Sequence, residues 1–288
     1  MIAFRRILFP VDFSKQDQEA APFVKAMAER FHSEVFLLHA AEFMPAWYGP
    51  PDAMALEPTL NFKGLLDERR EHLIQHLSAD LAGLHLRTVL EVGDPAKEIA
   101  KCARQQKIEL IMMPTHGYGP FRRVLLGSVT AKVLHDTDCP VWTGVHTDQL
   151  WSQKHSEWRR FLCAVDAKEV SLLQWASQFS REQKAELQVV HAVHASAPIP
   201  ASQESRSLHD FLLETAQERM AKLQAEAGTS FEIQMKFGKV GDVVREAASE
   251  CQADLVLIGR GVIQGVLGGL RSEAYDIIRE APCPVISI

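Results

Sequence analysis

The segment Leu110-Ile111-Met112-Met113-Pro114-Thr115-His116-Gly117 sets the architecture, together with the helical pattern that starts at Gly127-Ser128-Val129. The apolar run is typical of a buried strand, which here leads into a glycine-bearing loop and then a helix. Unpaired N–H groups and the dipole at a helix start favour an anion, and glycine lets the backbone approach it closely. Two interpretations follow: a nucleotide phosphate site, or a simple turn at Gly127 with Ser128 as an ordinary N-cap.

The rest of the first half alternates strands with helices. Helical spacing of apolar residues predicts helices over 17–31, 62–81, from Pro95 onward and over 129–135. Short apolar runs predict strands over 6–11, 35–40, 87–92, 108–113 and 139–142. Alternation of this kind implies a parallel sheet covered on both faces, with ligands beyond the carboxyl ends of its strands. Asp12, Ala40 and His116 each follow a strand end, so we expect them to converge there.

The second half of the chain repeats the first. Five segments match in the same order: 161–166 with 7–12, 189–192 with 37–40, Lys239-Val240-Gly241-Asp242 with Glu91-Val92-Gly93-Asp94, 254–259 with the fourth strand, and 283–285 with 139–141. We therefore expect an α/β protein with two tandem doubly wound parallel five-stranded sheets and helices on both faces. The predicted domains are residues 1–148 and 155–288.

Composition narrows the function classes. The chain has 288 residues, 24% of them charged, and a net charge of −6, so no affinity for nucleic acid or an anionic membrane is expected. No segment is long and apolar enough to span a bilayer, and we expect a cytoplasmic protein. The five cysteines form no CxxC pair, and neither a P-loop, a GxGxxG fingerprint nor a nucleophile elbow is present. We therefore predict no catalytic residue and no metal site built from protein ligands.

The repeats and the loop motif together resemble the universal stress protein family in its tandem form. The phosphate motif of that family is glycine, two residues, glycine, nine residues, then glycine with serine or threonine. Gly117 and Gly127-Ser128 fit the second part, whereas Pro114 replaces the first glycine. Proline has a fixed φ and no N–H, so one potential backbone donor is absent.

The resemblance implies an adenosine nucleotide, ATP or AMP, in the first domain. Asp12 would contact the adenosine, Ala40 would meet the adenine edge through its backbone, and Mg²⁺ would bind the phosphates. The complete set of nucleotide-binding residues implied by the resemblance is Pro10, Val11, Asp12, Ala40, Met113, Pro114, His116, Gly117, Gly127, Ser128 and Val129.

The second half departs further from the family motif. Asp166 remains, but the loop reads Gly259-Arg260-Gly261, and Arg271-Ser272 falls where Gly127-Ser128 stands. An arginine side chain would fill space that a phosphate needs. We interpret this half as a degenerate site with a structural or regulatory role.

The leading hypothesis is a cytoplasmic universal stress protein that binds an adenosine nucleotide and acts as a stress-response regulator or binding protein. A scaffold without nucleotide is one alternative, and a weak ATPase with at most slow hydrolysis is another. Short apolar strands end both repeats, at 140–142 and 284–288. Such strands could pair between subunits of a homodimer, or with each other within one chain.

Overall fold

The structure is a computed structural model that describes residues 1–41, 68, 71–72, 75–77, 79–115, 126–144, 158–193, 203–260 and 272–288, with the side chains of 203–207 and 272 excepted. Most described residues from Ala3 to Cys139 form one compact unit. The described residues from Pro140 to Ile288, with Met1 and Ile2, form the other. Residues 145–157, which include the boundary between the predicted domains 1–148 and 155–288, lie outside the described residues, so these boundaries stay a prediction.

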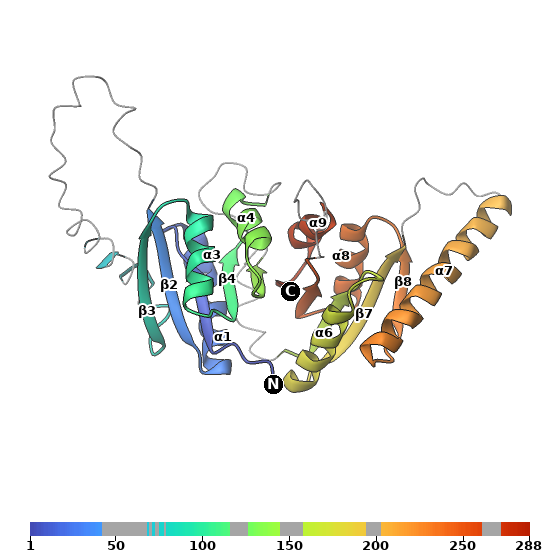
Figure 1. Ribbon diagram of the computed structural model, residues 1–288, viewed down its shortest axis with the longest axis horizontal. Helices are drawn as coiled ribbons and strands as arrows, with labels where there is room; N and C mark the ends of the chain where they lie inside the picture. Colours follow the sequence, from blue (N-terminus) through green and yellow to red (C-terminus); the bar gives the residue numbers. More distant parts are fainter. Residues whose placement is uncertain are drawn as a thin grey trace, which may run out of the picture. The chain divides into compact units, whose positions relative to one another are not determined.

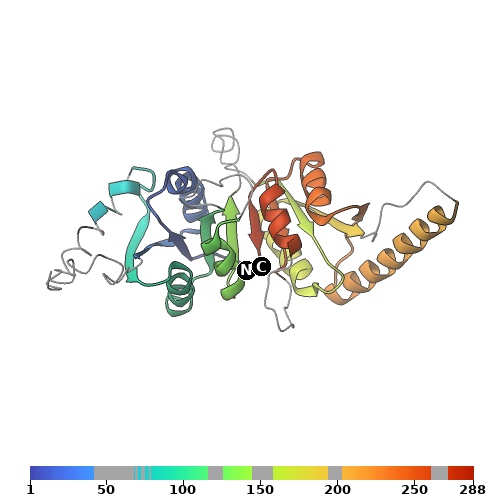
Figure 2. The same cartoon turned by 90° about the horizontal axis from the view of Figure 1, so that it is seen from above.

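The first unit has the predicted doubly wound pattern (Figure 1). Its strands are β1 (Arg6–Pro10), β2 (Glu34–Ala41), β3 (His85–Val92) and β4 (Leu110–Pro114), in the order β3-β2-β1-β4 with parallel pairing. Helix α1 (Lys15–Phe31) covers one face, and α3 (Pro95–Gln105) and α4 (Ser128–Asp136) cover the other (Figure 2). Most of the helix predicted over 62–81 lies outside the described residues, although residues 71–72 and 75–77 are helical.

The second unit repeats this arrangement. Its parallel strands β6 (Arg160–Ala164), β7 (Glu186–Val193), β8 (Ile233–Phe237), β9 (Leu255–Ile258) and β10 (Val285–Ser287) have the order β10-β9-β6-β7-β8. Helices α6 (Val170–Gln183) and α7 (Gln203–Ala227) cover one face, and α8 (Val240–Glu250) and α9 (Ser272–Glu280) cover the other (Figure 2). The α/β doubly wound class is therefore confirmed in both halves.

One carboxylate in each unit ties the first strand to its neighbour. The Oε2 atom of Glu109 accepts hydrogen bonds from the backbone N–H groups of Arg5 (2.6 Å) and Arg6 (3.1 Å). Asp254 repeats this contact through Oδ2, which accepts from the N–H groups of Arg159 (2.7 Å) and Arg160 (2.8 Å). A carboxylate that accepts hydrogen bonds from two backbone N–H groups stabilises the start of β1 and of β6.

The last strand of the first repeat belongs to the second unit. Strand β5 (Val141–Gly144) pairs with β10 in antiparallel register, with Trp142 opposite Ile286. Both side chains are buried, Trp142 at 2% and Ile286 at 0% exposure. Pairing of the two terminal strands within one chain, one of the two arrangements expected from the sequence, is thus the one observed. It also makes the sheet of the second unit mixed, whereas the expected sheets were all parallel.

One of the five repeat matches was out of register. In the structure, Gly93 follows β3 with a φ of 151°, and Gly238 follows β8 with a φ of 148°, so these two glycines are equivalent. The residue after each glycine is the helix N-cap: Asp94 for α3 and Lys239 for α8. Gly241, which the sequence match aligned with Gly93, lies inside α8. The shared Val-Gly-Asp sequence therefore aligned the two halves three residues away from the register that the structure shows.

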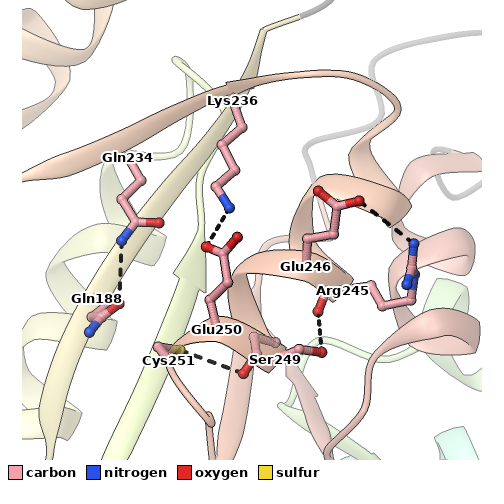
Figure 3. A network of polar contacts seen from close by, with 9 residues as sticks. Gln188, Gln234, Lys236, Arg245, Glu246, Ser249, Glu250 and Cys251 are labelled. Atoms are coloured by element: carbon pink, nitrogen blue, oxygen red, sulfur yellow. Dashed lines mark hydrogen bonds and ion pairs between the residues drawn. The ribbon is translucent and has the colours of Figure 1, made fainter.

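A network of polar contacts lies around α8 and the outer strand β8 of the second unit (Figure 3). The Nζ atom of Lys236 on β8 lies 2.5 Å from Oε2 of Glu250 on α8. On the same sheet, Nε2 of Gln234 donates to Oε1 of Gln188 over 3.5 Å. Within the helix, the Ser249 hydroxyl donates to the Arg245 carbonyl over 2.8 Å. These groups are largely exposed, so they contribute little to stability compared with the buried apolar face beneath them.

Candidate functional site

The sheet order of the first unit creates a switch point beside β1. The chain runs from β1 to β2 and β3 on one side, whereas β4 lies on the other side of β1. In open parallel sheets a ligand crevice forms at such a reversal, outside the carboxyl ends of the strands. Six predicted site residues lie at or directly after these strand ends: Pro10, Val11, Asp12, Ala40, Met113 and Pro114.

Asp12 lies two residues beyond the end of β1 and is held by local hydrogen bonds. Its Oδ1 atom accepts the N–H of Ser14 over 2.9 Å, and its own N–H donates to Oδ2 of Asp17 over 3.1 Å. Phe13 between them has a positive φ of 63°. The turn thus leaves the Asp12 side chain exposed at the end of β1, as a polar contact for a ligand requires.

The start of α4 is anchored to the end of β4. The N–H of Gly127 donates to the Thr115 carbonyl over 2.9 Å, and the Thr130 hydroxyl donates to the Pro114 carbonyl over 3.2 Å. Gly127 is the N-cap, and Ser128 is the first helical residue. The simple interpretation that made Ser128 the N-cap is therefore wrong.

The N-cap residue of this helix, Gly127, has no side chain and so makes no capping hydrogen bond of its own. The first N–H groups of a helix have no partner within the helix, so those of Ser128 and Val129 are suited to an anion. Gly127 and Val129 are half-buried, and Ser128 is exposed. His116 and Gly117, the other two predicted phosphate contacts, lie outside the described residues.

His39 at the end of β2 has a structural contact that its twin repeats. Its Nδ1 atom is 2.8 Å from the carbonyl oxygen of Val11, and Nδ1 of His191 is 2.9 Å from that of Val165. A carbonyl only accepts, so Nδ1 carries the proton in both rings and Nε2 of the neutral ring is an acceptor. One ring nitrogen of each histidine is therefore bound to a backbone carbonyl.

Sequence reasoning missed an aromatic and acidic cluster beside Asp12. Phe13 stacks on His72 with ring centroids 4.6 Å apart and contacts His39 at 4.5 Å. Nε2 of His76 lies 3.9 Å from Oδ2 of Asp17. The available signal was the four-residue spacing of the two histidines, which places both on one side of a helix.

Asp17 is the buried member of this cluster. Burial, followed by the charge of Asp12, raises the pKa of its carboxyl from 3.8 to about 8, against the opposing effect of backbone hydrogen bonds from Asp12, Phe13 and Ser14. Its side chain is only 1% exposed. The turn below the candidate site therefore contains a carboxyl group that titrates near neutral pH.

The corresponding edge of the second unit has the same strand and helix starts as the first unit but different residues in its loops. Asp166 follows β6 as Asp12 follows β1, and its N–H donates to Oε2 of Glu169 over 3.1 Å. Helix α9 begins at Ser272 as α4 begins at Ser128, so the predicted equivalence of these serines agrees with the structure. Arg271, however, lies outside the described residues.

Two half-chains have the same doubly wound fold, and the first strand of each lies at a reversal of strand order. This arrangement defines a tandem α/β protein. The sequence model of the universal stress protein family matches residues 3–143 and again 157–288. The chain belongs to the universal stress protein family, in tandem form.

Individual relatives agree with this assignment. Universal stress protein MJ0531 of Methanocaldococcus jannaschii is 31% identical over 140 residues, which are 48% of this chain and 80% of the relative. Universal stress protein MJ0577 of the same organism is 28% identical over 152 residues, 49% of this chain and 94% of the relative. The crystal structure of a universal stress protein from Archaeoglobus fulgidus has a TM-score of 0.66 at 20% identity, covering 100% of this chain and 97% of that one. That structural likeness supports the fold.

Proposed function

We propose that the first unit binds ATP or another adenosine nucleotide and that the protein acts in the cytoplasm as a stress-response regulator or binding protein. The observation that carries the proposal is the start of α4, whose N-cap Gly127 has no capping side chain and is anchored to the end of β4, the strand beside β1 at the switch point. Family membership supplies the ligand class. The structure describes no helix that is both long and apolar enough to cross a membrane.

The described residues fit such a ligand. Gly127 has no side chain to obstruct a phosphate, and the N–H groups of Ser128 and Val129 provide donors in the first turn of α4. Asp12 and the backbone of Ala40 would contact the adenosine, with Pro10, Val11, Met113 and Pro114 as the surrounding walls. His116 and Gly117 would complete the phosphate contacts. A bound nucleotide would bring Mg²⁺ on its phosphate oxygens, because this cation prefers oxygen ligands and retains water.

The same residues would give at most slow hydrolysis. The protonated Nδ1 of His39 is bonded to the Val11 carbonyl, which commits that ring to a structural contact. Asp12 accepts the N–H of Ser14 in the turn. Nucleotide binding would then act by favouring one conformation over another and so changing contacts with a partner protein.

Calorimetric titration of the nucleotide-stripped full-length protein with ATP and Mg²⁺ tests the proposal. Saturable binding is expected, and it should be lost in a Gly127→Val/Ser128→Ala variant. The matched control is Ser272→Ala, which changes the equivalent serine of the second unit and should leave ATP binding intact. If millimolar ATP produced no saturable heat in the parent protein, the alternative of a nucleotide-free scaffold would replace this proposal.

A further inference from the structure

The second unit contains a cavity of about 490 Å³ at the carboxyl ends of β6, β7 and β9. Residues from α7, α8 and α9 form the rest of its wall. Its volume lies within the range of about 300–1,000 Å³ that is usual for small-molecule sites. The unit interpreted from sequence as degenerate thus retains space for a ligand.

Most residues of the wall are apolar. They come from the sheet and from all three covering helices: Val190 and Ile258 from β7 and β9, Leu212 and Ala216 from α7, and Val244 and Ile277 from α8 and α9. Val190 and Ile258 are each 1% exposed, so the floor of the cavity lies deep between the sheet and the helices. A ligand that enters it therefore meets hydrocarbon on several sides.

Helix α7 adds exposed apolar surface at the same cavity. Phe211 lines the cavity and is 62% exposed. Leu208, three residues earlier and therefore on the same side of α7, is 51% exposed. Among the large apolar side chains that the structure describes, only Met1 and Leu86 are also exposed. A ligand that packs against Phe211 would remove apolar surface from water, which is favourable.

Several polar groups of the wall are engaged in hydrogen bonds within the unit. Oδ1 of Asp166 accepts the N–H of Ala167 over 2.6 Å, and Oε2 of Glu169 accepts the N–H of Asp166 over 3.1 Å. The Thr215 hydroxyl donates to the Phe211 carbonyl over 2.8 Å, inside its own helix. These groups therefore do not require a polar ligand to satisfy them.

Three further polar residues line the cavity. Nδ1 of His191 is bonded to the Val165 carbonyl over 2.9 Å, and Glu273 has an interaction of its own. Arg219 is exposed, so water hydrates its charge. A charged ligand would lose its own hydration on entry, which is costly, whereas a neutral apolar ligand would not.

Glu169 also fills the place that a phosphate group would need. Gly259 directly follows β9, at the sheet edge where doubly wound folds hold ligands. A glycine lets a phosphate approach the backbone closely, but a Cβ atom added to Gly259 would overlap the Glu169 carboxylate. The Glu169 side chain thus occupies this space already, and the cavity is unsuited to the phosphates of a nucleotide.

We propose that the cavity of the second unit binds a neutral apolar small molecule, whose aromatic or aliphatic body packs against Phe211 and the aliphatic wall beneath it. This site is separate from the proposed nucleotide site of the first unit and does not depend on it. The two units of the chain would then bind ligands of different chemical classes.

Fluorescence titration of the full-length protein with N-phenylnaphthylamine tests this site, because this neutral aromatic molecule emits strongly only in an apolar environment. Saturable binding is expected. In displacement, n-octanol should compete about fifteenfold more tightly than n-hexanol, from roughly fourfold for each buried CH₂. Octanoate, a carboxylate of the same chain length, should compete at least about tenfold more weakly than n-octanol. An absence of saturable binding, or equal competition by octanoate and n-octanol, would overturn the proposal.

Two variants of α7 locate the site. Phe211→Ala should weaken N-phenylnaphthylamine binding about tenfold, and its exposed position should leave the unit folded. Thr215→Trp places a large side chain in the cavity from a half-buried position and should block binding. Leu86→Ala is the matched control, since it truncates an exposed apolar side chain of the first unit and should leave binding unchanged. Unchanged binding in both α7 variants, or an equal loss in the control, would refute the assignment.

ATP distinguishes this site from a nucleotide site. The measurement uses the Gly127→Val/Ser128→Ala variant, so that nucleotide bound by the first unit does not contribute. Millimolar ATP with Mg²⁺ should leave the bound N-phenylnaphthylamine in place. Displacement by ATP would identify the cavity as a nucleotide site and overturn the proposal.

Discussion

Nδ1 of His39 donates a hydrogen bond to the carbonyl oxygen of Val11 over 2.8 Å, from the end of one strand to the end of its neighbour. The same bond joins His191 to Val165 in the second unit. The contact fixes the edge of the sheet on which each candidate ligand site is built. Because it recurs in both units, we assign it to the framework.

We expect His39→Ala to destabilise the first unit by about 2–4 kcal/mol. The substitution leaves the buried Val11 carbonyl without its donor and opens a cavity under Phe13. His39→Asn is the matched control, since its amide nitrogen can donate from nearly the place of Nδ1. Urea unfolding followed by circular dichroism measures both, and equal losses for the two variants would contradict a role for the hydrogen bond.

Asp17 should make stability depend on pH. Its carboxyl has a pKa of about 8 in the folded chain and 3.8 as its ordinary value, so the folded state retains a proton that the unfolded state has released between these values. The contribution is complete below about pH 4 and is lost as pH rises through 8, on the order of 1.4 kcal/mol per pH unit at most. Unfolding free energies measured from pH 5 to 9 should therefore decrease.

Asp17→Asn is the control for this pH dependence. Its amide oxygen still accepts the N–H of Asp12, but the side chain no longer titrates. The variant should have a flatter stability profile than the parent over the same pH range. A parent protein whose stability rises from pH 5 to 8 through this residue would show that the carboxyl is ionised when folded.

Trp142 belongs to the first repeat by sequence and stabilises the second unit by contact. Trp142→Ala should lower the free energy of unfolding by about 3–5 kcal/mol, because removal of a buried indole leaves a large cavity beside β5. Val35→Ala, a buried apolar truncation on β2, should instead destabilise the first unit. Hydrogen exchange of the β9 and β10 amides distinguishes the two: protection there should fall with Trp142→Ala and persist with Val35→Ala.

Asp94 and Lys239 are the N-cap residues of α3 and α8, and exchanging their residue types should change the melting temperature in opposite directions. Asp94 accepts the N–H groups of Ala96 (3.0 Å) and Lys97 (3.2 Å), and it pairs with Lys132 at 3.0 Å. Lys239 offers no acceptor, and its positive charge lies at the positive end of the helix dipole. Lys239→Asp should therefore raise the melting temperature by about 2–4 °C, whereas Asp94→Lys should lower it. Thermal unfolding checks both, and a decrease for Lys239→Asp would refute the N-cap assignment.

Local sequence determined much of this protein. Apolar runs and helical spacing predicted the strands β1, β2 and β4 to within two residues at their ends, and Asp94-Pro95 identified the start of α3. These signals are readable because they depend on neighbouring residues: the period of side-chain burial and the capping of free N–H groups. The duplication could also be recognised from the sequence, because the second half repeats the strand segments of the first in the same order.

Tertiary structure decided the rest, because it depends on residues far apart in the chain. Pairing of β5 with β10 joins Trp142 to Ile286, and no local pattern shows which strand edge an apolar segment will meet. Burial raised the pKa of Asp17, and folding brought His76 next to it. The register of Gly93 with Gly238 became clear only from backbone dihedral angles. Separate strands and helices likewise bring Asp166, Glu169 and Glu273 to the wall of one cavity in the second unit.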